Sequence, residues 1–488
     1  MSEPTSLSET KRRLFEKYVS GQITCNQAAG ATIIGRPLDQ PAPLSLVQEQ
    51  VWRRALSSDG ASSFYNESIT IHRTAELDIA ILERSFTEVI RRHEAWRTTF
   101  DSIDGRPIQV IHPAPSGVAI PCIDLRGTPK SSREAEALRW AMPDARRPFD
   151  LKQGPLVRAL LVTIDEKTHR LFLTMHQSIV DGISVYKILP LELATLYEAF
   201  SAGRASPLPD LPVQHADFAY WDRQRLQGQA FANQMAYWRE QLAGELPLPN
   251  CPSRQSRRSA EEWSGAIRAF TLPKDLCEEL KALSQREGVT LFVTLLAGFT
   301  AMLSRDTDRN EKIIVGTVAP AGRKHIEVQQ LLGYFLNPVS LCIDLNGNPS
   351  VHELLRRCQE VTLGALSNDD VPIEYLVQEL GPNRDPNRDS LFQMVITLAP
   401  SLPELGPNWD QTPMDLDGGW ARWDLYLELS DRPSGIIGRA QYRTDIFTSE
   451  MISEFLQNFR EVLGAIALNS EQRISSLIQS RSQKRASR

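Results

Sequence analysis

The sequence has none of the features that mark a secreted, disulfide-bonded or membrane-spanning protein. Its 488 residues include six cysteines, none of them in a CxxC pair, and a chain of this length can build its core without disulfides. The N-terminal residues contain no apolar signal core. No apolar run reaches the roughly 18 residues that a transmembrane helix needs. These absences predict a cytoplasmic protein with no membrane partner.

An excess of positive charge is also missing. The formal net charge is −6, whereas nucleic-acid-binding domains are commonly basic, so we expect no nucleic-acid partner. The exception is the end of the chain, where Arg481, Lys484, Arg485 and Arg488 stand among serines. This basic tail is either a solvated terminus or a docking segment for an acidic partner.

Several catalytic motifs are absent as well. The chain has no glycine-rich phosphate loop, no HExxH and no paired cysteine and histidine cluster. It also has no GxSxG elbow, which would indicate a serine nucleophile. The sequence therefore predicts no nucleotide site, no metal site and no covalent serine intermediate.

The order of hydrophobic patterns predicts an α/β protein of two lobes, because helical and strand patterns alternate in both halves of the chain. Between them, residues 246–262 lose all periodicity and are rich in proline, serine and arginine, which is typical of a linker. The expected divisions are an N-terminal helix and linker over 1–42, a first lobe over 43–245, the crossover over 246–262, a second lobe over 263–475 and the basic tail over 476–488.

Hydrophobic periodicity also predicts the single elements. Residues 77–94 form the clearest helix, which Asp78 can cap. A helix over 184–200 should be kinked at Pro190, and residues 216–242 look helical throughout. Further helices are expected over 5–18, 274–286, 290–304, 350–366 and 449–467, and strands over 156–164, 170–175, 312–317, 391–398, 423–429 and 435–442.

The most informative segment is the run Met-His-Gln-Ser-Ile-Val-Asp-Gly that ends at Gly182. It lies where a buried strand ends and a helix is about to begin, and loops at such junctions often carry functional residues. A polar His-Gln-x-x-x-Asp-Gly cluster is costly to bury unless each group has a partner. By itself the segment fits either a capped strand-to-helix turn or a functional site.

The segment resembles the HHxxxDG motif of condensation domains of nonribosomal peptide synthesis, which belong to the chloramphenicol-acetyltransferase-like superfamily. Six other segments resemble further motifs of this family and occur in the family's order. They are Ser45–Gln48 with Trp52 (SxAQxxxW), Arg92–Phe100 (RHExLRTxF), Asp217–Trp221 (DYAxW), Gly333–Asn337 (GxFVN), Asp370–Glu374 (D(Y/V)PFE) and Arg384–Arg388 (RDxSR). Motifs that run in one order from about residue 43 to 395 argue against a chance resemblance.

The resemblance implies two chloramphenicol-acetyltransferase-like lobes in a V-shaped arrangement, with a tunnel between them that is open at both ends. One end would receive a donor carrier protein and the other an acceptor carrier protein. Phosphopantetheine is then expected to arrive on the carrier proteins, and no cofactor to be bound by the chain itself. Neighbouring synthetase modules are further candidate partners, and the chain is either freestanding or one domain of a larger synthetase.

The chain departs from the family pattern at one decisive position. Members of the family use the second histidine of the motif for catalysis, and Gln177 stands in its place. An amide takes up no proton near neutral pH, although it accepts and donates hydrogen bonds, and general acid–base help contributes roughly 10²–10⁴ in rate. Because an α-amino group has a pKa of about 8 and is partly neutral, we expect amide rather than ester formation, with Gln177 positioning substrate or binding the oxyanion.

The alternative is a catalytically impaired protein that serves as a docking platform or gate for carrier proteins. The resemblance carries over a set of catalytic residues, namely His176, Gln177, Asp181 and Gly182, and a set of substrate-binding residues, namely Ser178, Tyr334 and Asn337. Asn337 could instead pair with backbone. Arg97, Asp217 and Arg323 are expected to be structural, and Arg323 is the candidate partner of Asp181, which would otherwise be a buried unpaired charge.

Overall fold

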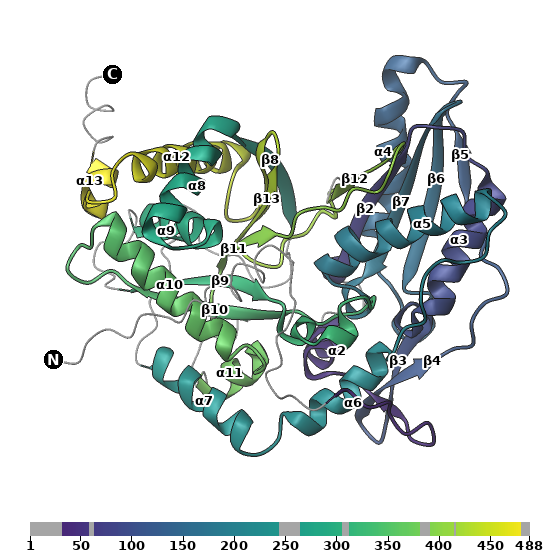
Figure 1. The fold of residues 1–488 in the computed structure, drawn as a ribbon, viewed down its shortest axis with the longest axis horizontal. Coiled ribbons are helices and arrows are strands. Elements are labelled where there is room, and N and C mark those ends of the chain that lie inside the picture. The colour runs from purple at the N-terminus through teal and green to yellow at the C-terminus, as the bar shows by residue number, and fades with distance from the viewer. Residues whose placement is uncertain are drawn as a thin grey trace.

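The computed structural model describes residues 32–57, 63–243, 264–304, 312–380, 391–413 and 416–479. They form two lobes arranged as a V, and each lobe is a β-sheet covered by helices (Figure 1). The prediction of an α/β fold with two lobes is confirmed. The expected helix over 5–18 and the expected crossover over 246–262 lie outside the described residues.

The first lobe is built on a five-stranded sheet with the order β12-β2-β7-β6-β5. Its strands are β2 (Asn66–Arg73), β5 (Cys122–Asp124), β6 (Val157–Asp165), β7 (Thr168–His176) and β12 (Trp409–Pro413), and its helices are α3 (Ile79–Arg92), α4 (Arg133–Arg146) and α5 (Leu189–Ser201). Alternate residues of β6, such as Val162, pack against α4, whereas residues of β7 such as Leu173 pack in the cluster formed with α3 and α5. Burial on both faces explains why these strands are nearly continuous apolar runs.

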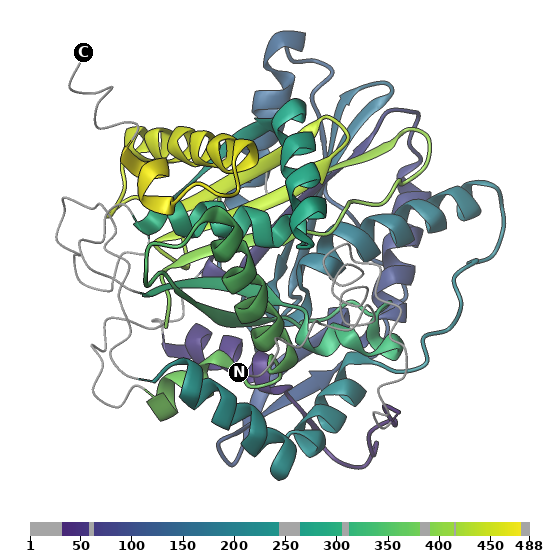
Figure 2. The same ribbon diagram turned by 60° about the vertical axis from the view of Figure 1, so that its left-hand side comes forward.

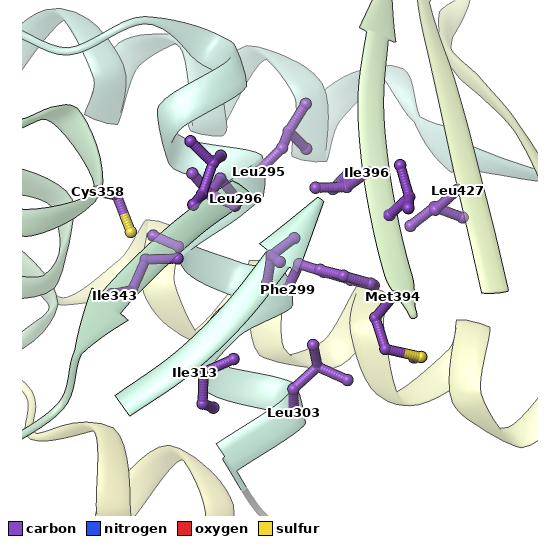
Figure 3. Close-up of a cluster of buried hydrophobic side chains, with 14 of the residues drawn as sticks. Leu295, Leu296, Phe299, Leu303, Ile313, Ile343, Cys358, Met394, Ile396 and Leu427 are labelled. Atoms are coloured by element: carbon purple, nitrogen blue, oxygen red, sulfur yellow. The ribbon is translucent and has the colours of Figure 1, made fainter. Parts of the chain in front are cut away.

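The second lobe is built on a six-stranded mixed sheet with the order β10-β9-β11-β13-β14-β8. Its strands are β8 (Gly265–Pro273), β9 (Lys312–Ala319), β10 (Asn337–Asp344), β11 (Met394–Ala399), β13 (Leu425–Arg432) and β14 (Gly435–Arg443). Its helices are α8 (Lys274–Glu287), α9 (Leu291–Leu303), α10 (Val351–Ser367), α11 (Ile373–Leu380), α12 (Ser449–Leu468) and α13 (Ile474–Gln479). Side chains of α9, among them Leu296 and Phe299, meet Ile396 and Leu427 of the sheet in the core (Figure 3).

Smaller elements join the lobes. They are α2 (Leu46–Ser57), α6 (His215–Arg225), α7 (Gln229–Gln241) and a three-stranded sheet of β1 (Ala42–Pro43), β4 (Arg106–Ile111) and β3 (Thr98–Ile103). The expected single helix over 216–242 is therefore two helices, because Gly228 has a φ of 76° just before α7. α7 lies against α11 (Figure 1, Figure 2), and its Met235 and Trp238 pack into the second lobe.

The division of the chain at the crossover is wrong for two segments. α7 precedes the crossover but belongs to the second core. β12 follows the crossover but pairs antiparallel with β2 over the full length of β12, so it completes the sheet of the first lobe. Apolar burial holds α7 in the second lobe, and backbone hydrogen bonds hold β12 in the first. A division of the chain into consecutive ranges cannot represent such segments.

The two ends of the expected division also differ from the structure. Within 32–42, which was expected to be linker, Ile33 is buried against α6 and Arg36 forms an ion pair of 2.8 Å with Asp217. Within 476–488, the first residues belong to α13, where Leu477 is 5% exposed and packs on the second core. The rest of the basic tail lies outside the described residues.

Two further expectations concern single helices. Asp78 caps α3 by accepting a hydrogen bond from Ile81 N–H, as predicted. The helix predicted over 184–200 begins as a π-helical turn, Ser184–Ile188, that runs into α5. Pro190 lies in the first turn of α5, where a missing N–H costs nothing, so it does not kink the helix interior.

Across the described ranges, no single helix is long and apolar enough to cross a membrane. α8 and α9 together reach the required length and apolarity, but they are bent by 104° at the break between them.

Candidate active site

The HQxxxDG segment lies where β7 ends, on the side of the first lobe that faces the second. His176 is the last residue of β7 and is paired with Asn66 on β2. Gln177–Ile179 form one 3₁₀ turn, and Asp181 then accepts a hydrogen bond from Ser184 N–H at 2.7 Å. The turn therefore presents Gln177 and the aspartate to the second lobe within a short stretch of chain.

His176 is fully enclosed and is held as a neutral ring. Its Nδ1 accepts the Ser178 backbone N–H at 3.2 Å and lies 2.7 Å from the Ser178 hydroxyl, so the ring proton resides on Nε2. Burial, aided by Arg158, lowers the pKa of His176 to about 3. The expected substrate-binding role of Ser178 is wrong, because its side chain is completely buried and bonded to this ring.

Asp181 forms the predicted ion pair with Arg323, which ties the two lobes together. Arg323 Nε lies 3.0 Å from Asp181 Oδ2 and Nη2 lies 2.9 Å from Oδ1, and both side chains are almost fully buried. Phe335 N–H donates to the same carboxylate at 3.3 Å. The remaining Arg323 Nη1 protons go to the carbonyls of Val328 and Leu331 at 2.8 and 2.7 Å. All charge in the pair is thus compensated, which is the condition for burying it.

The GxFVN-like segment, Gly333–Asn337, contacts the HQxxxDG segment, as the resemblance to the family predicts. Its asparagine, however, does not reach the cavity. The Ser184 hydroxyl donates to Gly333 O at 3.0 Å, and Tyr334 lines the same cavity as Gln177. Asn337 is fully buried, and its amide donates to the carbonyls of Asp369 and Val371 at 2.8 and 2.7 Å. The substrate-binding role expected for Asn337 is therefore wrong, and its alternative as a backbone partner is correct.

The two other residues expected to be structural are held by local contacts. Asp217 closes a capping box with Gln214 at the start of α6 and also pairs with Arg36. Arg97 donates to the carbonyl of His112 and lies 3.7 Å from Glu94. Neither side chain lines a cavity of the site.

Two cavities meet at the motif. The larger has a volume of about 560 Å³ and a mostly apolar wall, and the smaller has a volume of about 110 Å³ and contains Gln177 in its wall. They share walls formed by both lobes, namely Gly182, Tyr186, Val318, Leu336, Tyr426 and Glu428. Gly182 thus lies where the two cavities adjoin. A Cβ at this position would only touch the Tyr186 ring at 3.7 Å, so the local packing leaves room for one.

The smaller cavity contains ionisable residues that the sequence analysis did not identify. Glu67 comes from β2 and Glu428 from β13, so each lobe contributes a carboxyl group. Burial and the charge of Glu428 raise the pKa of Glu67 to about 8. Burial also raises the pKa of Glu428, although Tyr426 donates a hydrogen bond to it at 3.0 Å. The sequence carries little signal for these two glutamates, because both strands also contain other polar and charged residues, such as His72 in β2 and Asp431 in β13.

Tyrosines and one arginine complete the polar wall. Burial raises the pKa of Tyr334 to about 12 and that of Tyr186 well above its usual value, so both stay protonated as hydrogen-bond donors. Arg422 lines the cavity and its charge lowers the pKa of Glu67, against the effects of burial and of Glu428. Within the described part of the chain, the Gln177 amide has no side-chain hydrogen bond, so both of its groups are available to a molecule in the cavity.

The comparisons with known proteins agree with this architecture. Residues 39–486 match the family model of the Condensation domain, and the chain belongs to the condensation domain family. One of the linear gramicidin synthase subunits of Brevibacillus parabrevis is 36% identical over 453 residues. That match covers 91% of this chain but only 6% of the synthase subunit, so the chain corresponds to a small part of its relative's length.

Solved structures share the fold. The X-domain from teicoplanin biosynthesis superposes with a TM-score of 0.78 at 24% identity, covering 91% of this chain and 99% of that one. The first condensation domain of the calcium-dependent antibiotic synthetase, in complex with a substrate analogue, gives a TM-score of 0.77 at 20% identity and covers 90% of this chain and 99% of that one. The fold is thus that of condensation domains, with two chloramphenicol-acetyltransferase-like lobes.

Proposed function

We propose that the chain joins a carrier-protein-bound acyl thioester to the amine of a carrier-bound acceptor and so forms an amide in nonribosomal peptide or hybrid polyketide-peptide biosynthesis. The observation that carries this proposal is the pair of adjoining cavities between the lobes, which meet at Gly182 beside Gln177. Two substrates on flexible phosphopantetheine arms would be brought together there, and such proximity supplies much of the rate of a bimolecular step. The donor and acceptor carrier proteins are the partners, and neighbouring synthetase modules are the natural source of both.

In this reaction His176, Asp181 and Gly182 have positioning roles. His176 and Asp181 are buried and bonded within the protein, and they fix the turn that presents Gln177 to the cavity. The Gln177 NH₂ group is free of protein partners in the described residues and would donate to the oxyanion that develops on the thioester carbonyl. The larger cavity, with its apolar wall of residues such as Ile183 and Phe292, suits an apolar acyl or side-chain group.

The names of the relatives support the biosynthetic setting. Three different subunits of linear gramicidin synthase are each 36–38% identical to this chain. The chain spans 6–9% of their lengths, so activities of the rest of those proteins are not transferred to it.

The test is a single-turnover reaction of acyl-carrier and aminoacyl-carrier proteins with the chain, followed by mass spectrometry of the acceptor carrier protein. We expect the mass of the acyl group to be added to the aminoacyl group, and much slower product formation when a hydroxyacyl acceptor replaces it, because a neutral alcohol is a weaker nucleophile than a neutral amine.

The contrary outcome is binding of both carrier proteins without product from a range of donors and acceptors. That result would favour the docking platform or gate that the missing histidine suggests. The teicoplanin X-domain has also been solved in complex with OxyB, in a structure that covers 92% of this chain at a TM-score of 0.78, so a protein of this fold is known to bind another protein.

A further inference from the structure

Glu67 is a carboxyl group in the reaction cavity for which the motif gives no role. It lies on β2 opposite Met175 of β7, one pair away from the pairing of Asn66 with His176. β2 therefore carries Glu67 to the same end of the sheet as the HQxxxDG turn. Glu67 and Gln177 line one cavity of about 110 Å³, which is the room of a few waters at roughly 30 Å³ each.

The surroundings of Glu67 leave its carboxyl group without a protein hydrogen bond among the described residues and raise its pKa. Its oxygens are therefore open to the cavity. The charged groups that act on it are Glu428 of β13, Arg422 ahead of β13 and, more weakly, Asp181. Burial, together with Glu428 and Asp181, outweighs Arg422, and the resulting pKa of about 8 lies close to that of an α-amino group, roughly 8.

The other ionisable groups near the motif are poor bases for an amine. The His176 ring is enclosed, its Nδ1 is occupied by Ser178 and its pKa is about 3. Gln177 has no basic group. Glu428 already accepts the Tyr426 hydroxyl, and Asp181 is neutralised by Arg323.

We propose that Glu67 is the general base of this chain and takes the amine proton that the family's second histidine would take. This role rests on the proposed amide-forming function. It explains how the chain could form an amide without that histidine. The amine nitrogen attacks the thioester carbonyl, the C–N bond forms, and the Glu67 carboxylate receives the N–H proton directly or through one water. The C–S bond then breaks, and Glu67 returns the proton to the leaving phosphopantetheine sulfur, so no proton is gained or lost overall.

A carboxyl group with this proton affinity suits both halves of the step. A general base is most effective when its pKa is near the operating pH, and thiols have a pKa of roughly 8.5. Proton transfer from the amine nitrogen to Glu67, and later from Glu67 to the leaving sulfur, is then nearly balanced in free energy. A carboxylate with an ordinary pKa of roughly 4 would be too weak a base for this amine, so the enclosure by β13 of the second lobe is part of the function.

The test compares Glu67→Gln with the parent in single-turnover amide formation across pH, with saturating carrier-bound substrates. Dividing the parent rate by the variant rate cancels the titration of the amine, which both proteins share. We expect a ratio of roughly 10²–10⁴ above the pKa of Glu67, falling about tenfold per pH unit below it as Glu67 becomes protonated. The change should appear in kcat and leave KM nearly unaltered. Glu134→Gln, on α4 with a 59% exposed side chain, is the matched control and should follow the parent.

A second variant separates a chemical role from a structural one. Gln177→His added to Glu67→Gln should restore much of the rate, because an imidazole in the wall of the same cavity supplies a new base. A merely structural effect of Glu67→Gln would not be rescued in this way.

The fold supplies a readout that needs no substrate. Between pH 4.5, the ordinary pKa of a glutamate, and about pH 8, Glu67 is protonated in the folded protein but ionised in the unfolded chain. The parent should therefore lose stability as the pH rises through this window, relative to Glu67→Gln, in urea unfolding. Equal pH dependence of the two proteins would overturn the proposal, since Glu67 would then be an ordinary carboxylate.

The kinetic outcomes are distinguishable from failure of the proposed function. If the parent forms amide and Glu67→Gln matches it at every pH, Glu67 is not the base and the function stands. If the parent forms no amide with any carrier-bound pair, the proposed function fails and the role of Glu67 fails with it.

Discussion

At the scale of single residues, the substitution of glutamine at position 177 changes what one wall of the cavity can do. Its neighbour His176 is buried, bonded to Ser178 and uncharged, so it cannot replace the missing imidazole. The amide of Gln177 is a donor without a protein partner in the described residues. The chemistry of the site therefore depends on groups from other strands, in particular Glu67 of β2.

Variants of Gln177 test this division of roles. Gln177→Ala should slow single-turnover amide formation by roughly 10²–10³-fold, which is the usual cost of losing one oxyanion donor. Gln177→His should be faster than the parent below about pH 8, where Glu67 is mostly protonated but an imidazole with a pKa of roughly 6.5 is still largely unprotonated, and the gain should fade at higher pH. Gln227→Ala, on the exposed surface, is the control, and full activity of Gln177→Ala would show that this side chain does no catalytic work.

At the scale of elements, β12 is one of the two segments that cross between the lobes. All five of its residues pair with β2, so the second half of the chain closes the edge of the first-lobe sheet. Trp409 anchors the strand, because its indole N–H donates to Glu198 at 2.9 Å and its ring stacks edge-on against Tyr197 at 5.4 Å. Arg73 lies 4.7 Å above the same ring. β2 also carries Glu67, so the crossing strand supports the strand that holds the proposed base.

Trp409→Ala should therefore destabilise the protein by about 3–5 kcal/mol, the usual cost of truncating a buried tryptophan. Urea unfolding monitored by circular dichroism measures it. Trp140 on α4 is 45% exposed, and Trp140→Ala should stay within about 0.5 kcal/mol of the parent. Equal losses for the two variants would mean that the crossing strand contributes no more than a surface residue.

At the scale of the whole molecule, the position of one lobe on the other is held by a buried ion pair. Asp181 and Arg323 are 1% exposed each, and they come from segments 142 residues apart. Arg323 reaches across to the carboxylate while it also bonds the carbonyls of its own segment. The pair sits directly behind the HQxxxDG turn, so the same contact fixes the lobes and the cavity wall.

Asp181→Ala should cost roughly 3–5 kcal/mol, because it leaves the Arg323 guanidinium buried without its counter-charge. The measurement is the free energy of unfolding in urea. Asp124, whose side chain is 53% exposed beside Arg126, is the control, and Asp124→Ala should change stability very little because solvent screens the exposed pair. An unchanged melting temperature for Asp181→Ala would contradict the structural role of the pair.

The sequence by itself determined the α/β class, most of the helices, the family and the strands β6, β7, β9, β11, β13 and β14, because hydrophobic periodicity and motif order are local properties of the chain. For Asp181 it offered Arg323 only as a candidate partner, which the structure confirms. The tertiary structure alone decided which motif residues reach the cavity: Ser178 and Asn337 turn into the protein because backbone groups and a histidine ring need their hydrogen bonds. It alone placed β12 in the opposite lobe and enclosed Glu67 against Glu428. Strand pairing and the proton affinity of a carboxyl group depend on neighbours distant in sequence, and no local pattern records them.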